Sequence, residues 1–134
     1  VLILPIHQNE LILIKEYAVG SERYELGFPK GIVDAGESPE VAANRELQEE
    51  IGFAAKKLHF LRSLYSSPSH MYGLMHVFIA QDLYPSQLEG DEPEPLEIVR
   101  LPLSEIDRLL ADPNFAESRY LSALFMLREF LCSH

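Results

Sequence analysis

Apolar residues form short runs separated by turn-forming residues, which is the pattern of β-strands joined by tight loops. Val1–Ile6 and Leu11–Tyr17 flank Gln8-Asn9-Glu10, and this spacing predicts a hairpin. Within the second run, the four consecutive apolar residues Leu11–Ile14 predict a buried stretch. The other strand candidates are Arg23–Phe28, Gly31–Val33, Leu58–Tyr65, Tyr72–Asp82 and Leu96–Leu101.

The first helix signal lies between the strand candidates Gly31–Val33 and Leu58–Tyr65. Ser38 is a good N-cap residue and Pro39 suits the first helical position. Gly52 suits a C-cap, so a helix is predicted from Ser38 to about Ile51.

Two further helices are predicted after the last strand candidate. Ser104 is expected to cap a short helix that ends at Asp112-Pro113, with Asp107 in the capping-box position. A final amphipathic helix is expected over about residues 115–131, with Leu121, Leu124, Phe125 and Phe130 in the core. Mixed short strands with three helices predict an α/β or α+β sandwich.

Composition narrows the class of protein. The 134 residues are 47% apolar and 24% charged, so we expect one globular domain over residues 1–134. The chain begins in an apolar run without an initiator Met, and we expect a β-segment upstream of Val1 to be missing. No apolar run approaches the roughly 18–20 residues of a membrane span, so no membrane partner is expected.

Net charge and cysteine content limit the expected partners and the cellular compartment. The formal net charge of −10 argues against nucleic acid as a partner, but a bound divalent cation would still admit a phosphate substrate. The one cysteine, Cys132, excludes an internal disulfide and fits a reducing compartment, so we expect a cytoplasmic protein.

Candidate chemistry is concentrated on the first predicted helix. Glu46, Glu49 and Glu50 stand at positions i, i+3 and i+4, which are neighbours on one helix face. Three crowded carboxylates repel one another unless a cation lies between them, and oxygen ligands suit Mg²⁺. Arg45, four residues before Glu49, could pair with it and fix its orientation. The alternative is a solvated charged helix face.

The surrounding segment changes the weight of these alternatives. Residues 31–53 match G-x5-E-x7-R-E-U-x-E-E-x-G-U, where U is a bulky apolar residue, at every fixed place. A chance match to the seven fixed letters is on the order of 10⁻⁸ per starting position. The chain resembles the Nudix hydrolases on this motif and from end to end. The fixed letters are Gly31, Glu37, Arg45, Glu46, Glu49, Glu50 and Gly52.

This resemblance implies a fold, a reaction and a site. The fold would be an α/β/α sandwich with a mixed β-sheet, in which the motif forms a loop, a helix and a loop. The reaction would be hydrolysis of a nucleoside-linked diphosphate bond with Mg²⁺, or with Mn²⁺. The implied metal ligands are Glu46, Glu49, Glu50 and the backbone carbonyl of Lys30.

The same resemblance assigns roles to the other motif residues. Glu49 and Arg45 would belong to the catalytic machinery. Glu37 would pair with Arg45 or support the metal shell, while Gly31 and Gly52 would serve backbone geometry.

Two features outside the motif point to the substrate. Pro68 lies fifteen residues after Phe53, and a proline near this place is typical of the ADP-ribose hydrolases of the superfamily. The acidic segment 89–95 resembles their glutamate-rich loop, in which Glu92 would be the catalytic base and Glu94 a metal contact. The alternatives are an ordinary turn proline and a solvated acidic loop.

Residues 11–20, 24–28 and 80–95 resemble the bacterial ADP-compound hydrolases of the ADP-ribose pyrophosphatase group. This implies ADP-ribose, diadenosine triphosphate and NADH as substrates, release of AMP or ADP, and a homodimer. Ala18 stands where the group commonly has an arginine. Glu16 and Glu25 are candidates for hydrogen bonds to adenine or ribose, and ion pairs are the alternative for both.

Two other functions stay open at this point. One is hydrolysis of other nucleoside diphosphate derivatives or of nucleoside triphosphates. The other is a binding module that senses ADP-ribose or NAD and regulates a partner. The complete motif and the acidic composition favour an enzyme acting on a small nucleotide.

Overall fold

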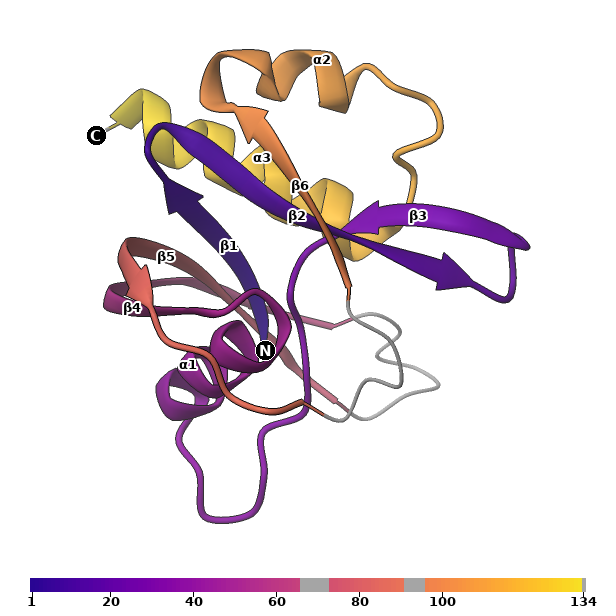
Figure 1. Ribbon diagram of the computed structural model, residues 1–134. Helices are drawn as coiled ribbons and strands as arrows, with labels where there is room; N and C mark the ends of the chain where they lie inside the picture. Colours follow the sequence, from indigo (N-terminus) through magenta and orange to yellow (C-terminus); the bar gives the residue numbers. More distant parts are fainter. Residues whose placement is uncertain (66–72, 91–95, 134) are drawn as a thin grey trace.

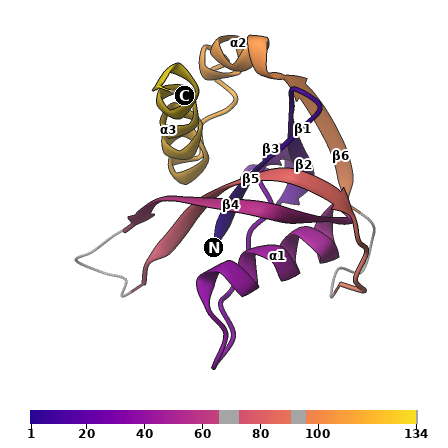
Figure 2. The ribbon, with the colours of Figure 1, turned by 90° about the vertical axis from the view of Figure 1, so that its left-hand side faces the viewer.

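A computed structural model describes residues 1–65, 73–90 and 96–133. In this part of the chain six strands form one sheet with helices on both of its faces, as Figures 1 and 2 show. The strands are β1 Leu2–His7, β2 Glu10–Ala18, β3 Arg23–Gly27, β4 Phe53–Leu64, β5 Met75–Pro85 and β6 Glu97–Pro102. The helices are α1 Pro39–Glu50, the 3₁₀ turn η1 Leu103–Glu105, α2 Ile106–Leu110 and α3 Ser118–Ser133.

The sheet is mixed and branches at β2. Its order is β3-β2-β1-β5-β4, and β1 and β5 are its parallel pair. Strand β6 runs antiparallel to β2. Glu10 pairs with both β1 and β6, and Ile14 pairs with both β3 and β6. Strands β1 and β3 therefore share one edge of β2, while β6 occupies the other edge.

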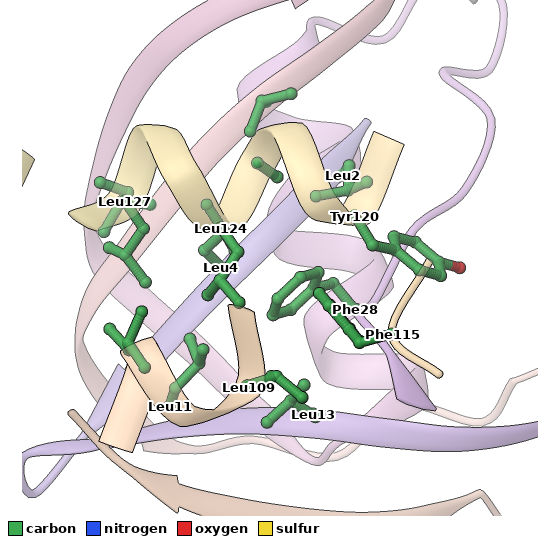
Figure 3. Close-up of a cluster of buried hydrophobic side chains, with 14 residues drawn as sticks. Leu2, Leu4, Leu11, Leu13, Phe28, Leu109, Phe115, Tyr120, Leu124 and Leu127 are labelled. Atoms are coloured by element: carbon green, nitrogen blue, oxygen red, sulfur yellow. The ribbon is translucent and has the colours of Figure 1, made fainter. Parts of the chain in front are cut away.

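Two hydrophobic clusters fill the two faces. Leu2, Leu4, Leu11 and Leu13 pack under α2 and α3, in the cluster drawn in Figure 3. The residues between them along β1 and β2 face α1 instead; they are Ile3, Ile12 and Ile14. Because both faces are covered, consecutive residues of β1 and β2 are apolar. The expected α/β/α sandwich and the buried Leu11–Ile14 stretch are confirmed.

Helix α1 starts and ends as its sequence predicts. The Ser38 side chain accepts a hydrogen bond from the Val41 N–H at 3.2 Å, and Pro39 is the first helical residue. At the other end the Gly52 N–H donates to the Leu47 carbonyl at 3.1 Å, and Gly52 has φ of +74°. A side chain at Gly52 would be strained by this φ and would also meet the Gln87 amide oxygen.

Three strand predictions need correction. Gly31–Val33 is not a strand: the isolated bridge in this region pairs the preceding residue, Lys30, with Leu2, and the chain then continues without regular structure toward α1. The Ile32 carbonyl accepts from the Arg45 side chain instead of from a strand, which explains the departure. Strand β4 begins at Phe53, five residues earlier than predicted, and β5 continues to Pro85.

The predicted cap of the short helix is also wrong. Ser104 lies inside η1, and neither η1 nor α2 begins with a side-chain cap hydrogen bond. Asp107 is therefore not part of a capping box. Helix α3 starts at Ser118, where the Glu117 carboxylate accepts from the backbone N–H groups of Arg119 and Tyr120 at 2.7 and 3.0 Å.

The core face of α3 is partly as expected. Its fully buried positions include Leu124, and Leu121 and Phe130 pack half-buried against the same cluster. Phe125 is 42% exposed, so its assignment to the core is wrong. The buried stripe runs through Tyr120, Ala123, Leu124 and Leu127, at helical spacing, and leaves Phe125 outside it. None of the helices in the described part of the chain is long and apolar enough to cross a membrane.

Candidate active site

Three of the four glutamates on α1, namely Glu46, Glu49 and Glu50, are largely buried, whereas Glu40 is exposed. The side chains of Glu46 and Glu49 are 12% and 19% exposed, and Glu50 is half-buried. A solvated helix face would leave such side chains in water, so this alternative does not describe α1. We refer to Glu46, Glu49 and Glu50 as the carboxylate cluster.

Arg45 joins two of these carboxylates to the loop before the helix. Its Nε and Nη2 donate to the two carboxylate oxygens of Glu37 at 2.8 and 3.0 Å. Its Nη1 lies 2.9 Å from Glu46 Oε1 and 3.4 Å from Glu49 Oε2. Nη2 also donates to the Ile32 carbonyl at 2.9 Å. The guanidinium thus holds the loop, Glu46 and Glu49 in one arrangement.

The charge of Arg45 sets the ionisation of Glu37. Hydrogen bonds from Arg45, together with one from the Asp34 N–H, lower the pKa of Glu37 to about 2. The same pair raises the pKa of the Arg45 guanidinium. This end of the motif is therefore a neutralised ion pair.

Glu50 faces a different environment. It accepts a hydrogen bond from the backbone N–H of Lys30 at 3.2 Å. The pKa of Glu50 is raised to about 8, mainly by burial and then by the charges of Glu46 and Glu16, while its contacts with Lys30 act in the opposite direction. Burial also raises the pKa of Glu46, against the opposing effect of Arg45. Full ionisation of all three carboxylates is therefore unfavourable in these surroundings unless a further cation is present.

Lys30 and Gly31 form the wall opposite these carboxylates. The Pro29 carbonyl accepts a hydrogen bond from the Ile3 N–H, and the Gly31 N–H donates one to the Val1 carbonyl. In this extended backbone the N–H and the carbonyl of Lys30 point the other way, toward α1. A Cβ at Gly31 would lie 2.0 Å from Glu46 Oε1, so only glycine fits there. Carboxylate and carbonyl oxygens are the donors that a hard divalent cation takes, and the residues present fit such an ion.

The carboxylates do not yet converge on one point. Among residues 1–65, 73–90 and 96–133, no three His, Cys, Asp or Glu side chains stand in the geometry of a metal site. Arg45 lies between Glu46 and Glu49, and Glu50 turns to the Lys30 N–H. A bound cation would compete with both contacts.

The carboxyl end of α1 contacts residues 86–90, which lead into the acidic segment 89–95. The Leu88 N–H donates to the Gln48 carbonyl at 3.0 Å, and the Ser86 hydroxyl donates to Gln48 Oε1 at 2.7 Å. A Cβ at Gly90 would lie 3.4 Å from the Glu49 Cβ. Gly90 is the last described residue before 91–95, so the predicted base Glu92 and the predicted metal contact Glu94 lie outside the described residues, as does Pro68.

A cavity of about 400 Å³ lies between the β2–β3 hairpin and the start of α3, and we call it the hairpin cavity. Both predicted substrate-binding glutamates line it, each in an ion pair. Glu16 Oε2 is 3.7 Å from Lys30 Nζ, and Glu25 pairs with Arg23. The pairing alternative is thus present, and the placement in a cavity fits the binding prediction as well.

Sequence reasoning missed several residues of this cavity. Lys30 was singled out only for its carbonyl, yet its ammonium lies over the Tyr120 ring, 5.3 Å from the centroid. Arg119 and Tyr120 line the cavity from the start of α3. Tyr120 points its hydroxyl away from the other labelled side chains in Figure 3. Its helical spacing indicates a core position, and nothing local indicates a cavity.

Comparisons with known proteins identify relatives that match nearly the whole chain. The chain is 58% identical over 131 residues to the ADP compounds hydrolase NudE of Escherichia coli K12, covering 98% of this chain and 70% of that protein. It is 32% identical to the ADP-ribose pyrophosphatase of Bacillus subtilis 168, covering 92% and 69%. A crystal structure of an ADP compounds hydrolase superposes with a TM-score of 0.94 at 57% identity, covering 98% and 71%.

The NUDIX domain profile matches residues 1–125, a range that contains the whole sheet, the carboxylate cluster and the first half of α3. The observed fold is that of the superposed ADP compounds hydrolase. The chain therefore belongs to the NUDIX family and is a Nudix hydrolase.

Proposed function

We propose that this hydrolase cleaves the diphosphate bond of ADP-linked compounds, namely ADP-ribose, diadenosine triphosphate and NADH, and releases AMP or ADP. The observation that carries the proposal is the crowding of three largely buried carboxylates next to Lys30, which also lines the hairpin cavity. The names of the two relatives, an ADP compounds hydrolase and an ADP-ribose pyrophosphatase, support the substrate class.

Mg²⁺ is the proposed cofactor, with Mn²⁺ as a substitute. Glu46, Glu49, Glu50 and the Lys30 carbonyl would hold it, with Glu94 as an additional contact. When bound, the cation neutralises diphosphate charge and lowers the pKa of a bound water. The net charge of −10 makes this neutralisation necessary, because an anionic substrate is otherwise repelled.

The remaining steps belong to side chains. We assign the general base to Glu92, which would take the proton of the attacking water while the diphosphate bond breaks toward the departing phosphate. Arg45 keeps Glu46 and Glu49 in place through its contacts at 2.9 and 3.4 Å. No covalent intermediate is needed. The position of Gly90 against Glu49 supports a base on the segment that follows.

The hairpin cavity is the proposed site of the adenosine half. Glu16 and Glu25 offer acceptors for ribose hydroxyls or the adenine amino group. Lys30 belongs to both the cavity wall and the contact with Glu50, so it joins the nucleoside site to the reacting phosphates. Pro68 is proposed as a further substrate contact, on the resemblance alone, and so is the homodimer.

A substrate panel tests the proposal. The protein is incubated with Mg²⁺ and ADP-ribose, diadenosine triphosphate, NADH or a nucleoside triphosphate, with EDTA as control, and products are separated by anion exchange. AMP and ribose 5-phosphate from ADP-ribose, abolished by EDTA, are expected. Binding of ADP-ribose without turnover of any compound would favour the sensing module. Preference for the nucleoside triphosphate would favour the other hydrolase class.

A further inference from the structure

A second cavity, of about 430 Å³, lies at the start of β5, and we call it the β5 cavity. Gly31, Ile32 and Val33 line one side of it, Met75 and His76 line another, and Tyr65 borders it after β4. His76 is two residues before Phe78, which packs against α1, so the His76 side chain lies on the α1 face of the sheet. This is the face that carries the carboxylate cluster.

The β5 cavity reaches the carboxylate cluster at Gly31. Gly31 lines the β5 cavity and is in contact distance of the Glu46 carboxylate. Ile32 also lines it, and the Ile32 carbonyl binds Arg45. Lys30 lines the hairpin cavity and contacts Glu50 through its backbone N–H. Adjacent residues therefore line the two cavities, Lys30 the hairpin cavity and Gly31 the β5 cavity, and both contact the carboxylate cluster where the diphosphate is proposed to react.

His76 is held in one orientation at the β5 cavity. Its Nδ1 is 2.7 Å from the Ser63 hydroxyl, directly across the β4–β5 ladder, and its ring lies 6.4 Å from that of Phe60. Because Nδ1 is engaged by Ser63, Nε2 is the ring nitrogen left to contact a ligand. In the described part of the chain no hydrogen bond to this nitrogen is found.

The other walls of the β5 cavity suit a sugar or a nucleoside. Ile32, Tyr65 and Leu74 line it with large side chains that are 80%, 63% and 49% exposed. Apolar and aromatic surface with one fixed polar group is the common composition of a small-ligand site. A ribosyl group offers apolar ring faces to such walls and hydroxyls to an imidazole.

We propose that the β5 cavity binds the group on the far side of the diphosphate, a ribosyl phosphate or second nucleoside, and that His76 determines specificity for it. Ser63 is then a positioning residue that acts through His76. This inference rests on the proposed function, because a compound with groups on both sides of a diphosphate needs a site on each side of the reacting bond.

Kinetics with the purified protein test the inference. His76→Ala should raise KM for ADP-ribose about tenfold, the loss of one hydrogen bond, and leave kcat within about twofold. Inhibition by ribose 5-phosphate should weaken, while inhibition by AMP, which lacks the distal group, should not change. Ser63→Ala should raise KM about threefold, and Ser63→Thr, which keeps the hydroxyl, should restore it.

A second histidine of the same strand pair provides the control. His59 pairs with Ile79 on the other face of the sheet, and its ring lies against Phe130 of α3. His59→Ala should keep the wild-type KM. Thermal melting of each variant shows that the fold is retained.

The outcomes separate the inference from the function on which it rests. Suppose that the wild type cleaves ADP-ribose, but that His76→Ala leaves the KM for ADP-ribose unchanged or weakens inhibition by AMP as much as inhibition by ribose 5-phosphate. The β5 cavity is then not the distal site, and the proposed function stands. If the wild type cleaves no ADP-linked compound, the proposed function fails and the inference fails with it.

Discussion

Glu37 and Glu50 belong to the same motif and stand at its two ends, but their surroundings act on them in opposite directions. Arg45 binds both oxygens of Glu37 and lowers its pKa to about 2. Burial beside other carboxylates raises the pKa of Glu50 to about 8. Arg45 pairs fully with the Glu37 end, whereas at the Glu50 end Lys30 offsets only part of the effect of burial and of neighbouring carboxylates. The motif thus combines a structural ion pair with the proposed cation site.

The largest expected difference between the two ends is in turnover. Glu50→Gln keeps the shape of the side chain but removes a proposed metal ligand, so kcat for ADP-ribose should fall about 10³-fold. The fold should survive, because the amide oxygen can still accept from the Lys30 N–H and the amide is neutral in this buried site. Glu97→Gln, an exposed surface change on β6, is the control and should keep full activity. Full activity of Glu50→Gln would show that the metal site is assigned to the wrong residues.

Metal addition should distinguish the two ends by stability. With Mg²⁺ at about 100 times its Kd, the free energy of unfolding should rise by about 2.7 kcal/mol in the wild type. Glu50→Gln should lose most of this gain, and Glu97→Gln should keep it. Thermal melting in EDTA and in Mg²⁺ measures both. An equal gain in Glu50→Gln would place the cation elsewhere.

The Glu37 end should carry stability that needs no metal. Arg45→Met leaves Glu37, Glu46 and Glu49 without their shared cation, and should lower the free energy of unfolding by about 2 kcal/mol. Urea unfolding in EDTA measures the loss. The control is Arg108→Met, because Arg108 is 79% exposed and pairs only at the surface of α2. A loss no larger than that of the control would contradict a structural role for the Arg45 network.

Sequence reasoning was reliable where the cause is local. The limits of α1 follow from Ser38, Pro39 and Gly52, and each makes the contact or adopts the backbone angle that the sequence predicts. The hairpin at Gln8-Asn9 is equally local, since both residues adopt positive φ. Such features depend on residues within a few positions of one another.

The failures share a dependence on distant partners. The apolar sequence of Gly31–Val33 predicts a strand. In the structure, however, the Ile32 carbonyl binds Arg45 and Gly31 packs against the Glu46 carboxylate, so this segment lies against α1. The two cavities join residues far apart in the sequence, such as Lys30 with Tyr120 and Gly31 with His76. No periodicity in the chain signals these pairs. The motif could therefore predict the carboxylate cluster, while the shape of the substrate sites required the fold.

Acid titration gives the smallest effect and isolates the Glu37 end. The pKa of Glu37 is about 2 in the folded protein against an ordinary value of 4.5, so the unfolded chain binds the extra proton between these pH values. The stability that Glu37 contributes is full above about pH 4.5 and is lost as the pH falls toward 2. Glu37→Gln should flatten this part of the curve of unfolding free energy against pH, measured by urea unfolding in EDTA. In an Arg45→Met background the same substitution should change the slope little, because Arg45 is the cause of the shift. A wild-type slope in Glu37→Gln would mean that other carboxylates dominate acid unfolding and that the ion pair is not the feature that separates the two ends of the motif.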